Sequence, residues 1–559
     1  MELTYYTSGG SGDGGDQYTG LDRFGRVVDQ RWDISGTDVE RLKYGYDRAS
    51  NRVWRQNTVA GSGQDEYYTQ DGLYQLATLQ RGTLNTGHTG ITGTPGWEED
   101  FNYDPLGNWH GSSSGYVTKV AGTTTLSQNR SHSKVNAISG LTTATGTAWA
   151  SPAQDAAGNL TTVPRPLSPA NGYTLKYDAW NRLVSVKAGS TVVATYAYDG
   201  ANRRVTKTTT NTRHYYYDDR WRVVEERLDS ATSADRRFVW GIRRLDDLIL
   251  RDREYGGGGD ESSSSSAGGE GLNRHRLYAV DDLANVTALV DRAGAVLERY
   301  GYNGFGGVRY LTAGFGSRST SLYDWETLFG SYRYDTDTGL YLARFRYFHP
   351  LLGRWINRDI IEELSGINLY AYCENNTVNF YDPLGLQSWM GPGYGAIPVD
   401  GSGGSSSGFS VFHGTPTNSQ TFTAPNGQTF LAPAGTDFQA EYNAGKSNGL
   451  FGANSQIGQY GKFDFQRNRG LGECSAGGTN VFYPAYTDAS NFGVGVYMNG
   501  AGYSLSETVE IGDTFALFKS SNAGATAQSQ LWTNGWYAAQ SGNLTNWSVS
   551  LTNSPSQKP

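Results

Sequence analysis

The chain has 559 residues, a formal net charge of −8 and only two cysteines, Cys373 and Cys474. The length predicts two or more domains, and the net charge argues against a broad basic surface for nucleic acids. Two cysteines exclude a disulfide framework and a metal site built from cysteine ligands.

The N-terminal twenty residues carry neither the basic nor the apolar segment of a signal peptide. No apolar run in the sequence is long enough to span a bilayer. If the protein leaves the cell, we therefore expect a route that reads no signal peptide of the usual kind, or export as part of a larger assembly.

A repeat occupies residues 1–327. Each copy has an aromatic strand, an Asp, a short turn of Gly or Asn, and a second alternating strand. Clear copies are "YGYDRASNRVWRQN" from Tyr44, "YDAWNRLVSVKAG" from Tyr177, "YAYDGANRRVTKTTT" from Tyr196 and "YYYDDRWRVVEERL" from Tyr215, with looser copies from Tyr68, Tyr103 and Asp155. Asp, Asn and Gly favour tight turns, and alternation buries one strand face. The pattern predicts a mainly β protein in which successive hairpins pair into long sheets.

Residues 256–271, "GGGGDESSSSSAGGEG", interrupt the repeats. Their composition is typical of a disordered surface insertion. A β-solenoid would satisfy the same repeat pattern and remains open at this point.

The repeats resemble the YD repeats of Rhs, teneurin and insecticidal toxin-complex proteins. Residues 328–386, "LFGSYRYDTDTGLYLARFRYFHPLLGRWINRDIIEELSGINLYAYCENNTVNFYDPLGL", resemble the Rhs-associated core. The resemblance implies a β-hairpin spiral that forms a shell around a C-terminal cargo.

Asp359 and Asp382 lie 23 residues apart in this core-like segment. The resemblance implies an intramolecular aspartyl protease that cuts after "DPLGL", between Leu386 and Gln387, with Arg346 assisting. Two carboxylates held close together cannot both ionise easily, so one would keep a proton while the other activates water. The alternative is that both aspartates only cap turns. The segment departs from the family pattern at "RDII" and "NNT", which replace Asp-Pro and Asn-Asn-Pro.

The composition changes sharply after Leu386. Residues 387–410 predict a flexible linker, and residues 411–559 a small α+β toxin domain. From residue 387 onward six basic and nine acidic side chains give a charge of −3, and His413 is the only histidine. These counts exclude an HNH nuclease and a zinc deaminase of the usual ligand set.

Residues 461–545 resemble the polymorphic toxin type 44 domain, which implies a ribonuclease. In that case one of three carboxylates would act as acid or base, Arg467 would steady the phosphate with Arg469, and Asn491 would orient the substrate. The three carboxylates are Asp464, Asp488 and Glu507. Each of these residues is also explained as an ordinary surface group.

Two alternatives remain. His413, Tyr497 and either Glu507 or Glu510 are similar to the constellation of ADP-ribosyltransferases, which would bind NAD; otherwise no cofactor and no metal is expected. A chain without an active cargo would be a cell-surface adhesin whose aromatic side chains stack on sugars.

The toxin interpretation implies partners and a location. We expect a cognate immunity protein, a delivery or shell-completing partner, and RNA as target. The protein would be secreted or displayed on the cell surface, and the toxin would act in the cytoplasm of a target cell.

Overall fold

The computed structural model describes residues 2–5, 20–22, 24, 26–241, 243–253, 275–282, 284–362, 366–386, 388–390, 410–411, 419–433, 436–448, 481–482, 487–505, 508, 526–542, 544–545 and 547–548. The predicted insertion at 256–271 lies outside these residues. The chain divides into two compact units, Met1–Gly395 and Ala396–Pro559. The division falls inside the predicted linker 387–410.

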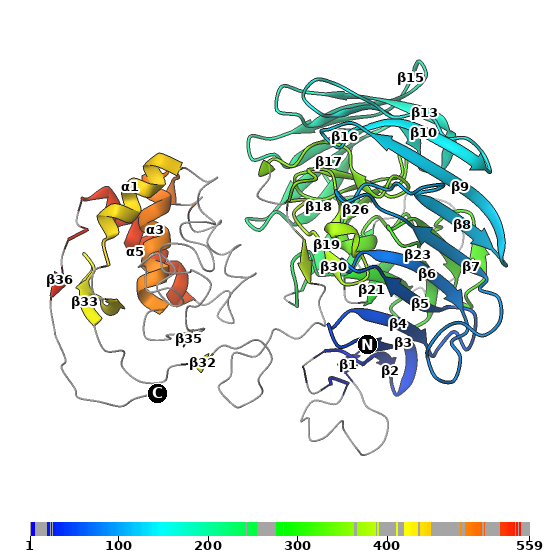
Figure 1. The fold of residues 1–559 in the computed structure, drawn as a ribbon, viewed down its shortest axis with the longest axis horizontal. Helices are drawn as coiled ribbons and strands as arrows, with labels where there is room; N and C mark the ends of the chain where they lie inside the picture. The colour runs from blue at the N-terminus through cyan, green and yellow to red at the C-terminus, as the bar shows by residue number, and fades with distance from the viewer. Residues whose placement is uncertain are drawn as a thin grey trace. The chain divides into compact units, whose positions relative to one another are not determined.

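The first unit contains two long antiparallel sheets (Figure 1). The first sheet holds β1 (Glu2–Tyr5), β2 (Asp29–Ile34), β3 (Thr37–Tyr46), β4 (Arg52–Asn57), β5 (Asp65–Gln70), β6 (Leu76–Gly82), β7 (Trp97–Phe101), β8 (Tyr116–Val120), β9 (Thr123–His132) and β10 (Ile138–Thr145). The second holds β11 (Ala153–Gln154), β12 (Leu160–Arg165), β13 (Ser168–Tyr177), β14 (Leu183–Ala188), β15 (Thr191–Tyr198), β16 (Arg204–Thr208), β17 (Thr212–Tyr217), β18 (Val223–Leu228), β19 (Arg236–Trp240), β20 (Leu248–Arg253), β21 (His275–Asp282), β22 (Asn285–Val290), β23 (Val296–Tyr302), β24 (Val308–Thr312) and β25 (Ser317–Arg318).

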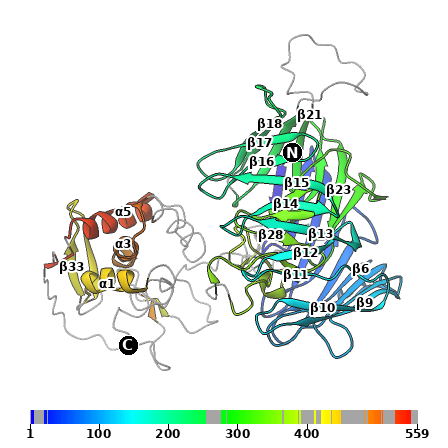
Figure 2. The same ribbon diagram turned by 90° about the horizontal axis from the view of Figure 1, so that it is seen from above.

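In both sheets the spatial order of the strands is their order along the chain. Each described strand pairs with its sequence neighbours, and the colour gradient follows the sheets without a crossover (Figure 2). The predictions of a mainly β protein and of successive hairpins are confirmed.

The turn of each repeat is held by its aspartate. Asp178 Oδ1 accepts the backbone N–H groups of Trp180 (2.9 Å) and Arg182 (3.0 Å), and Arg182 Nε donates to Asp178 Oδ2 at 2.7 Å. Asn181 takes a φ of 61°, a conformation that Asn tolerates better than most residues. The Asp and Asn positions of the repeat are therefore fixed by turn geometry.

The repeat tyrosines connect neighbouring hairpins. The hydroxyl groups of Tyr177, Tyr198 and Tyr217 donate to backbone carbonyls of the preceding repeat at 2.8, 2.7 and 2.9 Å. Buried carbonyl groups need such donors. The recurrence of Tyr rather than Phe follows from this bond.

The segment that follows the two sheets packs between them. It contains η2 (Phe329–Ser331), β26 (Arg333–Asp335), β27 (Leu340–Leu342), β28 (Tyr347–His349), β29 (Arg354–Trp355), η4 (Cys373–Asn375), β30 (Phe380–Tyr381) and β31 (Trp389–Met390). The largest hydrophobic cluster joins Phe101 of the first sheet, Leu289 of the second, and Phe348 and Tyr372 of this segment. Residues 325–373 thus complete the core of both sheets (Figure 1).

The second unit is α+β, as predicted. It contains β32 (Ser410–Val411), β33 (Ser419–Thr423), β34 (Thr429–Pro433), α1 (Phe438–Asn448), β35 (Val481–Phe482), α3 (Thr487–Gly500), α5 (Thr526–Gln540) and β36 (Trp547–Ser548). Strand β33 lies between β34 and β36, and β32 pairs with β35 in parallel. Phe422, Phe430, Phe438 and Phe492 form the centre of its core.

Candidate active site

Three side chains of residues 328–386 converge in the first unit. Arg346 precedes β28, Asp359 follows β29 and Asp382 follows β30. Arg346 Nη2 lies 2.7 Å from Asp359 Oδ2 and 3.3 Å from Asp382 Oδ2. Each of the three residues is at most 3% exposed, so their charges interact with little screening by water. The structure brings together the three residues that the sequence nominated for cleavage.

Asp382 holds the backbone that leads to the predicted cleavage point. Its Oδ1 accepts the N–H groups of Gly385 and Leu386, each at 2.9 Å. Gly385 has a φ of 74°, and a Cβ there would lie 3.2 Å from the backbone nitrogen of Arg346. Glycine therefore permits both the turn and its close approach to Arg346.

Arg346 holds the same turn from the other side. Its Nε donates to the carbonyl oxygen of Gly385, and its Nη1 donates to the carbonyl of Leu369 at 3.2 Å. The guanidinium lies over the ring of Trp355, 4.4 Å from its centroid. The peptide between Gly385 and Leu386 is thus held at its oxygen by Arg346 and at its nitrogen by Asp382. Gln387 itself lies outside the described residues.

Two buried tyrosines position Asp382. The Tyr332 hydroxyl accepts the Asp382 N–H at 3.0 Å and donates to the Asp382 carbonyl at 2.6 Å. The Tyr372 hydroxyl lies 3.1 Å from that of Tyr332. Burial raises the pKa of Tyr332 well above its usual value, and the charge of Asp382 adds to the rise. Sequence reasoning missed both tyrosines, because nothing distinguishes them from the many tyrosines of the repeats.

Cys373 lies close to this site and is a candidate nucleophile by position. Burial raises the pKa of its thiol well above the usual value, and the negative charge of Asp382 adds to the effect. A cysteine protease needs the thiolate. The thiol stays protonated here, so the carboxylates are the better candidates for chemistry.

The departures from the family pattern leave the site assembled. Ile360, which follows Asp359, is 49% exposed, and Asp359 Oδ1 accepts the N–H of Ile361 at 3.0 Å. The Thr377 hydroxyl donates to the carbonyl oxygen of Gly304, a bond that proline cannot make. Neither change separates the two carboxylates.

The site contains one more carboxylate than guanidinium. The sequence predicted two carboxyl groups in direct competition for one proton, whereas the structure places the guanidinium of Arg346 between them. Burial lowers the pKa of Arg346, and both aspartates oppose that shift. The positive charge reduces the repulsion between the carboxylates, and one added proton would neutralise the cluster.

The residues predicted for the toxin are described only in part. Asp464, Arg467, Glu507, Glu510 and His413 lie outside the described residues, as does Arg469. Asp488, Asn491 and Tyr497 all belong to α3.

These three residues of α3 differ in their surroundings. Burial raises the pKa of Asp488. The Asn491 Nδ2 atom is buried without a hydrogen-bond partner. Tyr497 is fully buried, and burial followed by the charge of Glu441 raises its pKa to about 12. Stacking of nicotinamide on Tyr497 would require this ring to become exposed.

Glu441 is a buried carboxyl group that sequence reasoning missed. It lies on α1 and is 0% exposed, and neither carboxyl oxygen has a hydrogen-bond partner among the described residues. It faces Gly493 of α3, where a Cβ would lie 2.5 Å from Glu441 Oε1. Burial alone raises the pKa of Glu441 well above its usual value. The signal available in the sequence was a glutamate on the helix face that carries Phe438 and Gly445.

The described residues contain no group of three or more His, Cys, Asp or Glu side chains arranged to hold a metal ion. None of the helices that the structure describes has the length and hydropathy of a transmembrane helix.

Comparison with known proteins identifies the repeats. Residues 177–214 match the family model described as RHS Repeat. This segment of the chain therefore has the sequence of an RHS repeat. The matched segment includes Tyr177 and Tyr198, whose hydroxyl groups connect the hairpins.

Two curated proteins are similar to this chain. The tRNA3(Ser)-specific nuclease WapA of Bacillus spizizenii is 28% identical over 237 residues, which are 41% of this chain and 9% of WapA. Toxin subunit YenC1 of Yersinia entomophaga is 25% identical over 397 residues, 63% of this chain and 38% of YenC1. The chain spans less than two fifths of the length of either relative.

Among solved structures, the Tc holotoxin pore of Photorhabdus luminescens is similar to this chain. The match has 19% identity and a TM-score of 0.47, and it covers 65% of this chain and 17% of the other.

Proposed function

We propose that this RHS-repeat protein is a toxin protein that releases its C-terminal unit by cutting its own backbone between Leu386 and Gln387. The observation that carries the proposal is the convergence of Asp359, Asp382 and Arg346 in a buried site. The backbone N–H of Leu386 is bonded directly to Asp382. Turn capping accounts for the Oδ1 atoms of both aspartates, but not for the approach of both Oδ2 atoms to one nitrogen of Arg346.

Cleavage consumes one water molecule. One ionised carboxylate takes a proton from the water, and the water oxygen bonds to the carbonyl carbon of Leu386. The other carboxyl, which carries a proton, donates to the carbonyl oxygen. When the tetrahedral intermediate collapses, the carbon–nitrogen bond breaks and the nitrogen of Gln387 takes up the proton that the first carboxylate removed from water. The second carboxylate takes back a proton from a hydroxyl group of the intermediate, so both groups return to their starting states. Arg346 offsets the negative charge of the buried site and, through the Gly385 carbonyl, holds the turn in place.

Intact-mass measurement of the purified full-length chain tests this proposal. The wild-type chain is expected to yield two fragments, the second beginning at Gln387, while Asp359→Asn and Asp382→Asn stay intact. Asp337→Asn is the control, because its side chain is 44% exposed and belongs to no part of the site; it should cleave normally. A wild-type chain that remains intact contradicts the proposal, and a second fragment beginning at Leu386 moves the cut by one residue.

The released unit is proposed to be a ribonuclease that acts in the cytoplasm of a target cell. The relative WapA is named as a nuclease specific for a tRNA, and YenC1 as a toxin subunit. Asp488 and Asn491 on α3 are the described candidates, joined by Asp464, Arg467 and Glu507. A cognate immunity protein would protect the producer, and a delivery or shell-completing partner would enclose the cargo during export to the cell surface or medium.

Incubation of the chain with total RNA tests the ribonuclease. We expect degradation by the wild-type protein and a loss of about 100-fold or more in Asp488→Asn if this carboxyl is the acid or base. Asp437→Asn, at the start of α1, is the matched control. Consumption of NAD without RNA loss would favour the transferase that uses His413 and Tyr497, and inactivity in both assays would favour the adhesin.

A further inference from the structure

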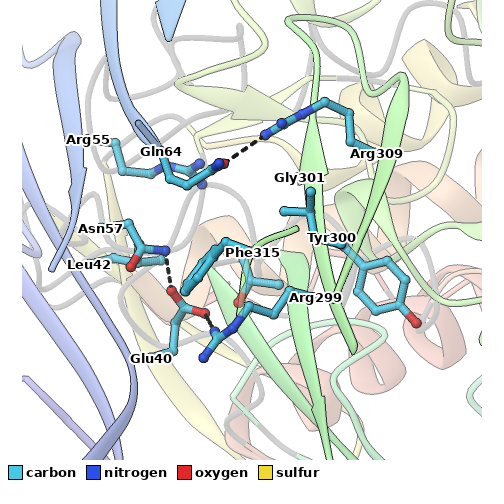
Figure 3. Close-up of a pocket in the computed structure, with 12 residues that line it drawn as sticks. Glu40, Leu42, Arg55, Asn57, Gln64, Arg299, Tyr300, Gly301, Arg309 and Phe315 are labelled. Carbon is cyan, nitrogen blue, oxygen red and sulfur yellow. Dashed lines mark hydrogen bonds and ion pairs between the residues drawn. The ribbon is translucent and has the colours of Figure 1, made fainter. Parts of the chain in front are cut away.

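A small charged pocket lies where the two sheets of the first unit face each other. Glu40 and Arg55 reach it from β3 and β4, and Arg299 and Arg309 from β23 and β24 (Figure 3). Gln64, just before β5, extends toward Arg309 (Figure 3). The pocket is not connected with the candidate cleavage site, whose residues do not line it.

Most charges around this pocket are paired. Arg299 Nη1 lies 2.5 Å from Glu40 Oε2. Arg55 lies 2.7 Å from Asp282 and 3.2 Å from Glu66, and Glu66 also pairs with Arg81 at 3.0 Å. These ion pairs join the first sheet to the second, since Glu40 and Arg299, and likewise Arg55 and Asp282, belong to different sheets.

Arg309 is the exception. Its guanidinium donates to Gln64 Oε1 at 3.2 Å, and it forms no ion pair with a carboxylate of the described residues. Its Nε is buried and finds no hydrogen-bond partner in the described part of the chain, and the same holds for the Nε of Arg55. Two guanidinium N–H groups at this pocket therefore have no acceptor among the described residues.

Burial makes the charge of Arg309 destabilising for the folded state. Burial, followed by the positive charge of Arg81, lowers the pKa of Arg309 to about 9, and the charges of Glu66 and Glu99 oppose this shift only in part. Arginine nevertheless keeps its proton at neutral pH. A buried cation that is not in direct contact with a carboxylate destabilises the folded state, so an anion from solution would stabilise this region.

The backbone is shaped to hold Arg309 in this position. Gly301 of β23 is the register partner of Arg309 of β24. A Cβ on Gly301 would collide with the guanidinium of Arg309. The glycine therefore leaves the space in which the arginine side chain crosses to the pocket.

We infer that this pocket binds a small oxyanion, of the carboxylate or phosphate class, with Arg309 as its main ligand. The Nε–H groups of Arg309 and Arg55 supply donors, and charge-assisted bonds to an oxyanion are stronger than neutral ones. The bound anion would pair directly with Arg309 where the two sheets meet and so help to hold them together.

Thermal unfolding of the full-length chain tests this inference. In buffers of constant ionic strength, adding inorganic phosphate in place of chloride is expected to raise the Tm of the wild-type chain in a saturating manner. The rise should be about 3 °C at roughly 100 times the dissociation constant. Acetate in parallel experiments distinguishes a carboxylate from a phosphate ligand.

Two variants of the pocket and one control variant test the role of Arg309. Arg309→Gln should lose the saturating rise, and without phosphate it should be at least as stable as the wild type, because the unpaired charge is gone. Gly301→Ala should weaken phosphate binding by displacing Arg309. Arg237→Gln removes the same charge from a side chain that is 53% exposed, and it should keep the full response. No saturating rise in the wild type, or an unchanged rise in Arg309→Gln, would overturn the inference.

Discussion

Replacing Arg346 by methionine is expected to abolish self-cleavage and to lower the free energy of unfolding of the first unit by about 3–5 kcal/mol. Arg346 is the ion-pair partner of both Asp359 and Asp382. Without it two carboxylates that are 3% and 2% exposed would repel each other with no counter-charge. Denaturant unfolding followed by tryptophan fluorescence measures the loss.

A triple variant separates the two effects. Arg346→Met combined with Asp359→Asn and Asp382→Asn removes the uncompensated charges while leaving cleavage impossible. It should therefore recover most of the lost stability and stay uncut. An Arg346→Met chain as stable as the wild type would show that the guanidinium does not neutralise the pair.

Replacing Glu441 by glutamine is expected to stabilise the C-terminal unit at neutral and alkaline pH. Burial raises the pKa of Glu441 above its ordinary value of 4.5. At pH values between 4.5 and the raised pKa of the folded state, the folded state holds a proton on Glu441 that the unfolded state has lost. The free energy of unfolding therefore falls as pH rises through this range. The slope for one group is about 1.4 kcal/mol per pH unit. Glutamine has nearly the same shape and carries no titratable group, so this pH dependence should disappear.

Hydrogen exchange of the full-length chain measures the effect region by region. As the pH rises above 4.5, the ordinary pKa of this carboxyl group, peptides of α1 and α3 should progressively lose protection in the wild type relative to Glu441→Gln at the same pH. Peptides of β13 to β16 in the first unit serve as the internal control and should not differ. Glu441→Leu should behave like the glutamine variant, because the effect comes from burying the carboxyl group. Equal protection of wild type and variant at all pH values would contradict the assignment of a neutral buried acid.

The local part of the fold was predictable from residues close in sequence. Asp178 bonds to the backbone of its own turn, and Asn181 takes the left-handed conformation of that turn. Tyr198 bonds to the backbone of the preceding hairpin. Because these interactions span at most a few tens of residues, the repeat pattern predicts the meander directly.

The candidate site was predictable only in its composition. The motif resemblance nominated Asp359, Asp382 and Arg346, but the position of the guanidinium between the carboxylates depends on how β28, β29 and β30 pack. The contacts of Tyr332 with Asp382, and of Glu441 with Gly493, join residues about fifty positions apart. Local patterns carry no information on such pairs, since one tyrosine or glutamate looks like another.

The strand order of the two sheets has a consequence for the order of assembly. Each hairpin joins only the hairpin made just before it, so the sheets can grow from the amino end as the polypeptide emerges. Residues 325–373 need side chains from both finished sheets before they can bury their own. The carboxyl groups of Asp359 and Asp382, proposed for cleavage, are thus expected to be among the last groups of this unit to reach their places. If the proposal holds, an unfinished protein would keep its C-terminal unit attached.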